Sequence, residues 1–262
     1  MLSWAFNEEE SIAEFIGKAE QFLRELTDDF ELIIIDDGSA DGTRRIVESQ
    51  LPHQPWLRLY VNDRNRGSGF NMRTAIGLAQ KDYLFCQTVD WSYDISALLQ
   101  CWPLLHQYDV LQGFRPHATS LDGILGHRSD TRWKGVVSVV NYGLLRLLFP
   151  LPVRDFQNVT VYPRALAQQL QLAGNSAFTN PEGLLKASWA GASIKEFPVP
   201  FRKRRHGQAK GTRLPVILRS MRDMLRCWWS NRNAHRPQAQ LTPWLGVEEG
   251  AAVLPASRRR AA

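Results

Sequence analysis

Two adjacent carboxylates end a short apolar run near the start of the chain. The run 32–35 is β-branched and apolar, as expected of a buried strand, and Asp36 and Asp37 follow it directly. Gly38 and Gly42 then allow the backbone to turn sharply. Carboxylates at such a strand end can accept hydrogen bonds from a ribose or from the imide of a base, and they repel bare phosphate. The alternative is an ordinary acidic turn between a strand and a helix.

A second acidic strand end lies about fifty residues further on, where Thr88 and Asp90 follow the apolar run 83–87. A carboxylate in this position can hold Mg²⁺ or Mn²⁺ bridging a diphosphate, because hard oxygen ligands suit these ions. Capping of a following helix is the alternative role for Asp90. Two acidic strand ends at one edge of the same sheet favour a shared binding site over coincidence.

Strands and helices alternate over about the first 113 residues, which indicates an α/β fold with a doubly wound, mainly parallel sheet and helices on both faces. Beyond Phe114 the alternation breaks into a basic linker, a helix near 136–148, a strand near 159–162 and two further helices. The expected strands of the first part are Met1–Phe6, Glu31–Ile35, Leu57–Val61, Tyr83–Gln87 and Asp109–Gln112, and its helices are expected from Glu8 (capped by Asn7), from Asp41, over Gly69–Gln80 and over Ile95–His106.

The composition is that of a folded protein, with 262 residues, 44% of them apolar and 22% charged. The three cysteines are too few and too scattered for a disulfide framework or a metal cage, which fits a reducing cytosol. No apolar run approaches the roughly 20 residues of a membrane span. We therefore expect a cytoplasmic protein, at most attached to the cytoplasmic face of a membrane.

The positive charge is concentrated in one stretch. Residues 202–236 hold eleven Lys or Arg and a single acid, Asp223, within a chain whose net charge is +6. This predicts an anionic partner: nucleic acid, membrane phosphate or a diphosphate substrate. Residues 213–236 read as a basic amphipathic helix, either packed on the protein or lying at an anionic membrane. Its apolar stripe comprises Leu214, Ile217, Leu218, Met221, Met224, Leu225 and Trp228, with Arg219, Arg222 and Arg226 along one flank.

These motifs resemble a known family. Asn-Glu-Glu-Glu-Ser at 7–11, Asp-Asp-Gly-Ser-Ala-Asp-Gly-Thr at 36–43 and Thr-Val-Asp at 88–90 are similar to the nucleotide-binding half of family-2 glycosyltransferases with the GT-A fold. The second half resembles the dolichol- and polyprenyl-phosphate sugar synthases, and the resemblance covers roughly residues 2–230. Its marks are Gly113-Phe114-Arg115, Ser138 to Asn141, Val153-Arg154-Asp155, Glu182, the run 195–201, and Arg204, Gly207 and Lys210 in an R-x-x-G-x-x-K element.

The resemblance implies transfer of a sugar, with inversion, from a nucleoside diphosphate-sugar to an acceptor such as a polyprenyl phosphate. The chain is then expected to comprise a nucleotide-sugar-binding half (1–113) and an acceptor-side half (114–212), followed by the basic helix (213–236) and a tail (237–262) whose Ala, Pro and Gln content predicts disorder. For the nucleotide, the resemblance implies that Ala5, Phe6 and Glu8 line the base and ribose pocket and that Asp36 and Asp37 bind the base or ribose. Asp90 would hold Mg²⁺ or Mn²⁺ on the diphosphate, and Thr88 and Arg115 would contact the substrate. Arg204 and Lys210 would contact phosphate from a loop that closes over the donor.

The chain departs from the family pattern at Thr88, where the first acid of an Asp-x-Asp motif is expected. The loss of one carboxylate should weaken metal binding unless the Thr88 hydroxyl serves the ribose instead. Asp94 could substitute as a ligand, or it could cap a helix. Only five or six residues, counted from Met1, precede the acidic corner, which is fewer than the family's first strand normally has. Either this strand is short or the natural chain begins earlier.

No motif supplies an obvious general base. Asp155 and Glu182 are the best candidates for an alcohol acceptor, and both could instead orient other groups. A phosphate monoester needs no base, because its second pKa is about 6. Two alternative functions stay open: a nucleotide-sugar-binding protein without activity, which Thr88 supports, and a nucleic-acid-binding protein using the basic stretch. Against nucleic acid, aromatic residues do not interleave with the basic residues until Trp228.

Overall fold

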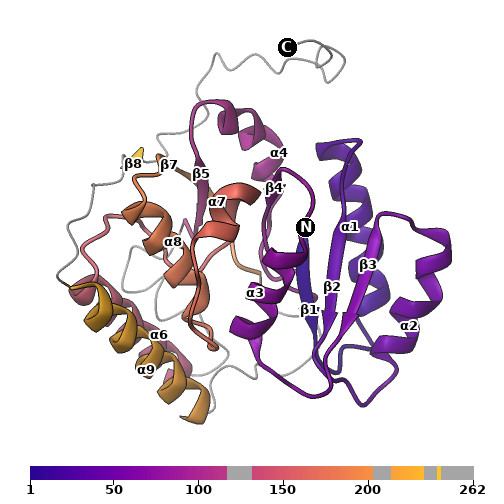
Figure 1. The fold of residues 1–262 in the computed structure, drawn as a ribbon, viewed down its shortest axis with the longest axis horizontal. Coiled ribbons are helices and arrows are strands. Elements are labelled where there is room, and N and C mark those ends of the chain that lie inside the picture. Colours follow the sequence, from indigo (N-terminus) through magenta and orange to yellow (C-terminus); the bar gives the residue numbers. More distant parts are fainter. Residues whose placement is uncertain (117–131, 203–213, 233–240, 243–262) are drawn as a thin grey trace.

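The computed structural model describes residues 1–116, 132–202, 214–232 and 241–242, and shows strands covered on both sides by helices (Figure 1). The strands are β1 (Leu2–Ala5), β2 (Leu32–Asp36), β3 (Leu57–Val61), β4 (Tyr83–Leu84), β5 (Val110–Phe114), β6 (Thr160–Pro163), β7 (Ile194–Pro198) and β8 (Leu241–Thr242). The helices are α1 (Ile12–Leu26), α2 (Thr43–Gln50), α3 (Ser68–Leu78), α4 (Ala97–Cys101), α6 (Arg132–Leu148), α7 (Arg164–Gln169), α8 (Thr179–Trp189) and α9 (Leu214–Asn231), with short 3₁₀ helices at Leu51–His53 and Trp102–His106.

The strands form two hydrogen-bonded groups, which are connected to each other through β1. The strands β1, β2 and β3 are parallel and adjacent in that order, and β4, β6, β5, β7 and β8 follow one another in a second group. Leu2 joins the groups, since its N–H donates to the carbonyl of Phe85 at 2.8 Å and its carbonyl accepts the N–H of Gln87 at 3.0 Å. Only β6 runs antiparallel to its neighbours among these pairings. The predicted mainly parallel sheet is confirmed, and the carboxyl ends of β1, β2 and the segment 85–87 meet at one edge.

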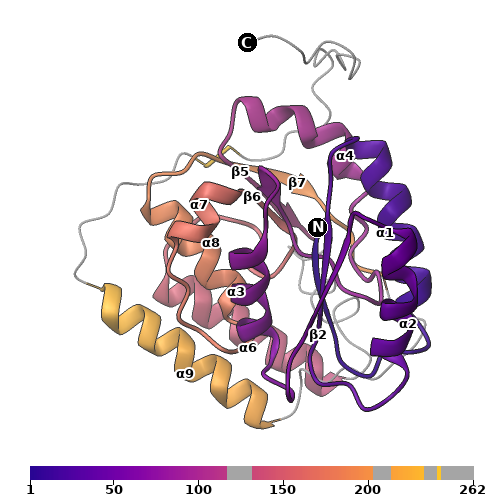
Figure 2. The same cartoon turned by 45° about the vertical axis from the view of Figure 1, so that its right-hand side comes forward.

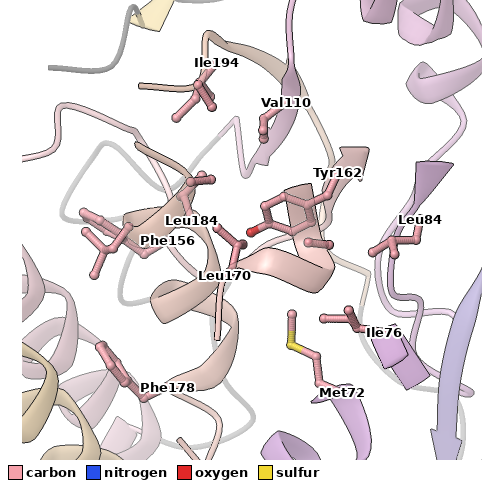
Figure 3. Packing of buried hydrophobic residues seen from close by; sticks show 14 of the residues in the cluster. Met72, Ile76, Leu84, Val110, Phe156, Tyr162, Leu170, Phe178, Leu184 and Ile194 are labelled. Carbon is pink, nitrogen blue, oxygen red and sulfur yellow. The ribbon is translucent and has the colours of Figure 1, made fainter. Parts of the chain in front are cut away.

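Successive residues of β2 point into two different cores. Ile33 belongs to a cluster with Met72 of α3, and Figure 3 shows Met72 pointing toward the ring of Tyr162 in that cluster. Ile34 belongs to the opposite cluster with Phe15 of α1. A strand buried on both faces needs apolar side chains at every position, which explains the unbroken apolar run before the first pair of carboxylates.

Two predicted helices differ from those observed. The first begins at Ile12 instead of Glu8, because Asn7 adopts a left-handed conformation with φ of 53° and its side chain binds another loop. The helix predicted over 95–106 is divided into α4 and a 3₁₀ helix that has Pro103 in its first turn. A proline has no N–H for the α-helical hydrogen bond, so the α-helix gives way to the tighter 3₁₀ form at this point.

The basic stretch and the end of the chain are described in part. The helix α9 lies within the predicted helical region 213–236, and Figure 2 places it on the outer side of the molecule, away from α1 and α2. The strand β8 pairs with β7, so two residues of the tail predicted to be disordered take part in the sheet. The predicted boundary at residue 113 falls inside β5. Among the helices that the structure describes, none is both long and apolar enough to cross a membrane.

Candidate active site

The ends of β1 and β2 are joined by hydrogen bonds between the two loops that follow them. Ala5 lies opposite Asp36 in the parallel register. The N–H of Asn7 donates to the Ser39 hydroxyl at 3.0 Å, and its side-chain carbonyl accepts the N–H of residue 40 at 2.9 Å. The N–H of Glu8 donates to the Thr43 hydroxyl at 2.8 Å. Asn7, predicted to cap the first helix, and Glu8, predicted to begin it, therefore shape the corner beside the acidic strand end.

Asp36 and Asp37 are both buried but have different partners. Asp37 accepts hydrogen bonds from the Asn62 side chain at 2.8 Å and from the N–H groups of Arg66 and Gly67 at 2.7 and 3.0 Å. Within the described parts of the chain, Asp36 accepts only long contacts of 3.3 and 3.4 Å from the N–H of Ser39. Asp37 thus organises the loop between β3 and α3, whereas Asp36 has the hydrogen-bonding capacity for a ligand.

Steric crowding explains why a glycine, Gly38, follows these two acids. Gly38 has φ of 74°, a region that side chains rarely adopt, and a Cβ atom there would lie 2.7 Å from the backbone of Arg64. The loop after β3 therefore packs directly on the turn after β2. Asp41 accepts hydrogen bonds from the N–H and hydroxyl of Thr43, the first residue of α2. Burial would raise the pKa of Asp41, but the hydrogen bonds from Thr43 and Glu9 outweigh it and lower that pKa.

At the second acidic strand end, Thr88 and Asp90 form a bonded pair. The Thr88 hydroxyl donates to Oδ1 of Asp90 at 2.6 Å, and the same oxygen accepts the N–H of Ser92 at 3.0 Å. Asp94, considered as a substitute ligand, accepts hydrogen bonds from the N–H and hydroxyl of Ser96 and pairs with Arg202. Its carboxylate is therefore used at the start of α4, which favours the capping role over metal binding.

The residues at this edge fit a divalent ion that is held jointly with a ligand. No group of three or more His, Cys, Asp or Glu side chains suited to a metal occurs in the described parts of the chain. Asp90 supplies one carboxylate, with the Thr88 hydroxyl beside it. Mg²⁺ in particular is commonly bound by one or two carboxylates together with substrate phosphates. The donor set is therefore compatible with an ion whose other ligands come from a diphosphate.

A cavity of about 320 Å³ opens beside this pair and lies between the two halves of the chain. Thr88 lines it from the first half, and Asn158 and Asn180 line it from the second. All the side chains that line it are uncharged, a combination of hydroxyls, amides and apolar groups suited to a hydroxylated neutral molecule. The lining residues are Trp4, Ser68, Met72, Cys86, Gln87, Thr88, Tyr93, Gln157, Asn158, Val159, Ser176, Ala177, Thr179 and Asn180.

Several of these residues were missed at the level of sequence. Asn158 and Asn180 lie in no recognised motif, and their relationship depends on folding: the side chain of Asn180 donates to the backbone carbonyl of Asn158 at 2.8 Å. Trp4, in the first strand, was likewise not among the residues predicted for the site. Cys86 also lines the cavity, and burial raises the pKa of its thiol to about 12, which disfavours the thiolate.

Asp155 and Arg115 form a bidentate ion pair. Nε and Nη2 of Arg115 donate to the two carboxylate oxygens at 2.5 and 2.8 Å, and Asp155 is 1% exposed. Burial alone would lower the pKa of Arg115, but the adjacent Asp155 raises it above its usual value. The same carboxylate accepts the N–H of Gln157 at 3.0 Å and contacts the Asn158 amide at 3.3 Å. Asp155 thus orients residues that line the cavity, and its role as a base stays a prediction.

Glu182 is buried in α8 and is not among the residues that line the cavity beside Thr88. Its oxygens accept the N–H groups of Ala173 and Gly174 at 3.0 and 2.9 Å, and Lys186 pairs with it at 2.7 Å. It lines a second cavity, of about 250 Å³, between α8 and α9. The predicted catalytic role of Glu182 is not tested by this placement. Arg204 and Lys210 lie outside the described residues.

The helix α9 separates into an inner and an outer face. Met224 and Cys227 are buried against the protein, whereas Leu218, Leu225 and Trp229 are 55%, 46% and 64% exposed. The predicted apolar stripe therefore combined residues of two faces. The outer face also carries the exposed residues Arg219, Arg222, Arg226 and Arg232.

Two known glycosyltransferases are similar to this chain in sequence. Glycosyltransferase AglD of Haloferax volcanii is 28% identical over 236 residues, which cover 86% of this chain and 36% of that protein. Dolichyl-phosphate beta-glucosyltransferase of Dictyostelium discoideum is 28% identical over 140 residues, covering 49% and 42% respectively. The chain thus spans well under half the length of these relatives.

Solved structures share the fold. Mannosyltransferase PcManGT of Pyrobaculum calidifontis, in complex with GDP-Man and Mn²⁺, superposes with a TM-score of 0.59 at 13% identity, over 90% of this chain and 64% of that one. Glucosyl-3-phosphoglycerate synthase of Mycobacterium tuberculosis, bound to Mn²⁺, UDP and glucosyl-3-phosphoglycerate, gives a TM-score of 0.61 at 15% identity, over 87% and 78%. These neighbours have the GT-A fold. The model of glycosyl transferase family 2 matches residues 4–159, more than half of the chain, and the protein belongs to that family.

Proposed function

We propose that this protein transfers a sugar, with inversion, from a nucleoside diphosphate-sugar to a polyprenyl phosphate. The proposal rests on the carboxylates found at the edge of the sheet where β1, β2 and the segment 85–87 end. Asp36 with its corner offers acceptors for a nucleoside, and Asp90 offers a carboxylate for a metal-bound diphosphate. The uncharged cavity beside Thr88 would then receive the sugar. A Mg²⁺ or Mn²⁺ ion, when bound, would neutralise charge on the leaving diphosphate.

The two predicted bases support a phosphate acceptor over an alcohol. Asp155 is held by Arg115, and Glu182 is held by two backbone amides and Lys186. An alcohol would need a carboxylate within reach to remove its proton. A phosphate monoester with a second pKa of about 6 arrives largely ionised, so its own oxygen can attack the sugar. The similarity to a dolichyl-phosphate beta-glucosyltransferase supports this acceptor class.

The outer face of α9 would bring the enzyme to its lipid. It combines Leu218, Leu225 and Trp229 with arginines, and the only acid of the helix, Asp223, is buried. Apolar side chains and arginines on one exposed face suit the headgroup region of an anionic membrane. We therefore place the protein at a membrane surface, with α9 as the contact.

The test is a panel of UDP-, GDP- and dTDP-sugars with Mn²⁺, with Mg²⁺ or with EDTA. Each donor is offered a short-chain polyprenyl phosphate and, as the matched control, the corresponding polyprenol. We expect transfer from one donor class to the phosphate, with the metal, and none to the alcohol. Transfer to the polyprenol would contradict the proposal that the acceptor is a phosphate. Donor binding without transfer or hydrolysis would favour the alternative of a nucleotide-sugar-binding protein, for which the Thr88 departure is the specific motive.

A further inference from the structure

The segment 173–177 forms a wall between two cavities. Ser176 and Ala177 line the cavity that also contains Thr88, and Ala173 and Gly174 line the second cavity between α8 and α9. A displacement of this segment would therefore change the shape of the cavity proposed to hold the reacting groups.

Side chains from three helices hold the backbone of this wall. Glu182 of α8 accepts the N–H groups of residues 173 and 174, and Asp223 of α9 accepts the N–H of Asn175 at 3.1 Å. Arg73 of α3 donates to the carbonyl of Gly174 and to the Asn175 side chain. The backbone N–H groups of residues 173–175 thus donate to two carboxylates, and the carbonyl of Gly174 accepts a hydrogen bond from Arg73.

Close packing leaves the wall little room. A Cβ atom at Gly69 of α3 would lie 2.5 Å from the carbonyl carbon of Asn175 and 2.4 Å from the Thr179 hydroxyl. A Cβ atom at Gly174 would lie 2.9 Å from the same hydroxyl. Small changes in the hydrogen bonds of the wall therefore translate into changes at Ser176 and Thr179, both of which line the cavity.

Asp223 is unusual in its helix. It is the one acidic residue of α9, it is 8% exposed, and it lies on the inner face beside Met224. Its other oxygen is 3.6 Å from Nη2 of Arg222. Burial of a carboxylate is unfavourable unless hydrogen bonds or charges compensate it. The bond to the Asn175 amide is such a compensation, and it is the point at which α9 reaches the wall.

We infer that Asp223 is a positioning residue for the transfer reaction: by binding the Asn175 amide it fixes the wall of the cavity from the helix that faces the membrane. The inference rests on the proposed function. Without Asp223 the Asn175 amide would face the second cavity, where polar groups allow water to replace the lost partner. Removal of the carboxylate should therefore leave the chain folded while loosening the wall.

The test compares Asp223→Ala with Asp223→Asn and with Cys227→Ala, a matched control that enlarges the same cavity and keeps the hydrogen bond from Asn175 to Asp223. Misplacement of reacting groups by about 1 Å can cost roughly a hundredfold in rate, so we expect Asp223→Ala to lower kcat at least about tenfold. Its nucleotide affinity should stay within about twofold, because the nucleoside is proposed to bind beside Asp36, to which the wall makes no hydrogen bond among the described residues. Asp223→Asn keeps a carbonyl acceptor and should retain most of kcat, as should Cys227→Ala.

A second measurement makes the outcome independent of turnover. Hydrogen–deuterium exchange of the peptide containing 173–177 should accelerate in Asp223→Ala and stay at the wild-type rate in Cys227→Ala. Unchanged exchange, or kcat within twofold of wild type, would overturn the inference. So would a parallel loss of nucleotide affinity and kcat, which would indicate a merely structural role. If the wild-type chain transfers no sugar at all, the proposed function fails, and the exchange experiment still decides whether Asp223 holds the wall.

Discussion

The hydroxyl of Thr88 donates a 2.6 Å hydrogen bond to Oδ1 of Asp90, at the position where related enzymes are expected to carry two carboxylates. The chain therefore replaces a pair of negative charges by one charge and its hydrogen-bond donor. Without a cation, this arrangement is more stable than two adjacent carboxylates, which repel each other. We expect this replacement to weaken the binding of the metal ion.

We expect Thr88→Asp to tighten nucleotide binding in Mn²⁺ by up to about tenfold, roughly 1.4 kcal/mol, and to weaken it in EDTA. Titration calorimetry with UDP or GDP, with and without the metal, measures both effects. Thr88→Ser keeps the hydroxyl and serves as the control, with unchanged affinity. Asp90→Ala should abolish the effect of Mn²⁺, and full activity of that variant in EDTA would disprove the metal site.

Asp36 and Asp37 should separate binding from folding. Asp36→Ala is expected to weaken nucleotide binding by about 1–3 kcal/mol while the melting temperature stays close to wild type, because only long contacts to Ser39 are lost. Asp37→Ala should instead lower the free energy of unfolding by about 1–3 kcal/mol, since three donors lose their acceptor. Calorimetry and urea unfolding distinguish the two. Equal effects of both variants on both quantities would contradict the division.

Glu31 should contribute a pH-dependent part of the stability. Burial would raise its pKa, but hydrogen bonds from the amides of Gln80 and Lys81 and the ion pair with Arg58 at 2.6 Å outweigh it and lower the pKa below the ordinary 4.5. A lowered pKa stabilises the folded state above the unfolded pKa, and this contribution is lost as the pH falls through the folded value.

Glu31→Gln should therefore be about 1–3 kcal/mol less stable than wild type at pH 7, and the difference should shrink as the pH falls below about 4.5. Urea unfolding at a series of pH values measures it. Glu48→Gln, which breaks an exposed pair with Arg44, is the control and should change stability by less than about 1 kcal/mol. A difference that does not change with pH would show that Glu31 acts through packing alone.

The outer face of α9 predicts a charge-dependent membrane contact. Replacing Arg219, Arg222 and Arg226 together by Gln should reduce sedimentation with phosphatidylglycerol-containing vesicles, by about 1 kcal/mol for each arginine near the surface. Turnover of a water-soluble acceptor should change little. Raising the salt concentration should weaken wild-type binding, since exposed charges are screened within about 8–10 Å. The matched control is Lys18→Gln with Arg24→Gln on α1.

Arg204 and Lys210 should behave in the opposite way. We expect their replacement to lower turnover and to leave vesicle binding largely intact, because the resemblance assigns them to phosphate contacts. Parallel loss of binding and catalysis in both sets of variants would contradict the separation. Vesicle binding unaffected by the α9 triple variant would end the proposal of a membrane face.

The fold and the acidic corner after β2 could be predicted because their signals are local. A strand buried on both faces must be apolar at each position, so the run before Asp36 was visible as a strand and its end as a turn. The glycine at 38 marks a left-handed turn for the same reason, since a side chain there would strike the backbone of residue 64. Alternation of such segments is enough to indicate a doubly wound sheet.

The partners of the buried charges depended on contacts between residues distant in the sequence. The sequence marked Asp155 as a candidate base but could not show that Arg115, forty residues away, lies 2.5 Å from it, and Asp223 counted only as the lone acid of a basic helix. Which side of α9 meets the protein could not follow from periodicity, because Leu218 and Met224 are equally apolar in sequence and only packing buries one of them. Local spacing determines elements and their ends, whereas the chemistry of a side chain depends on the neighbours that the fold brings to it.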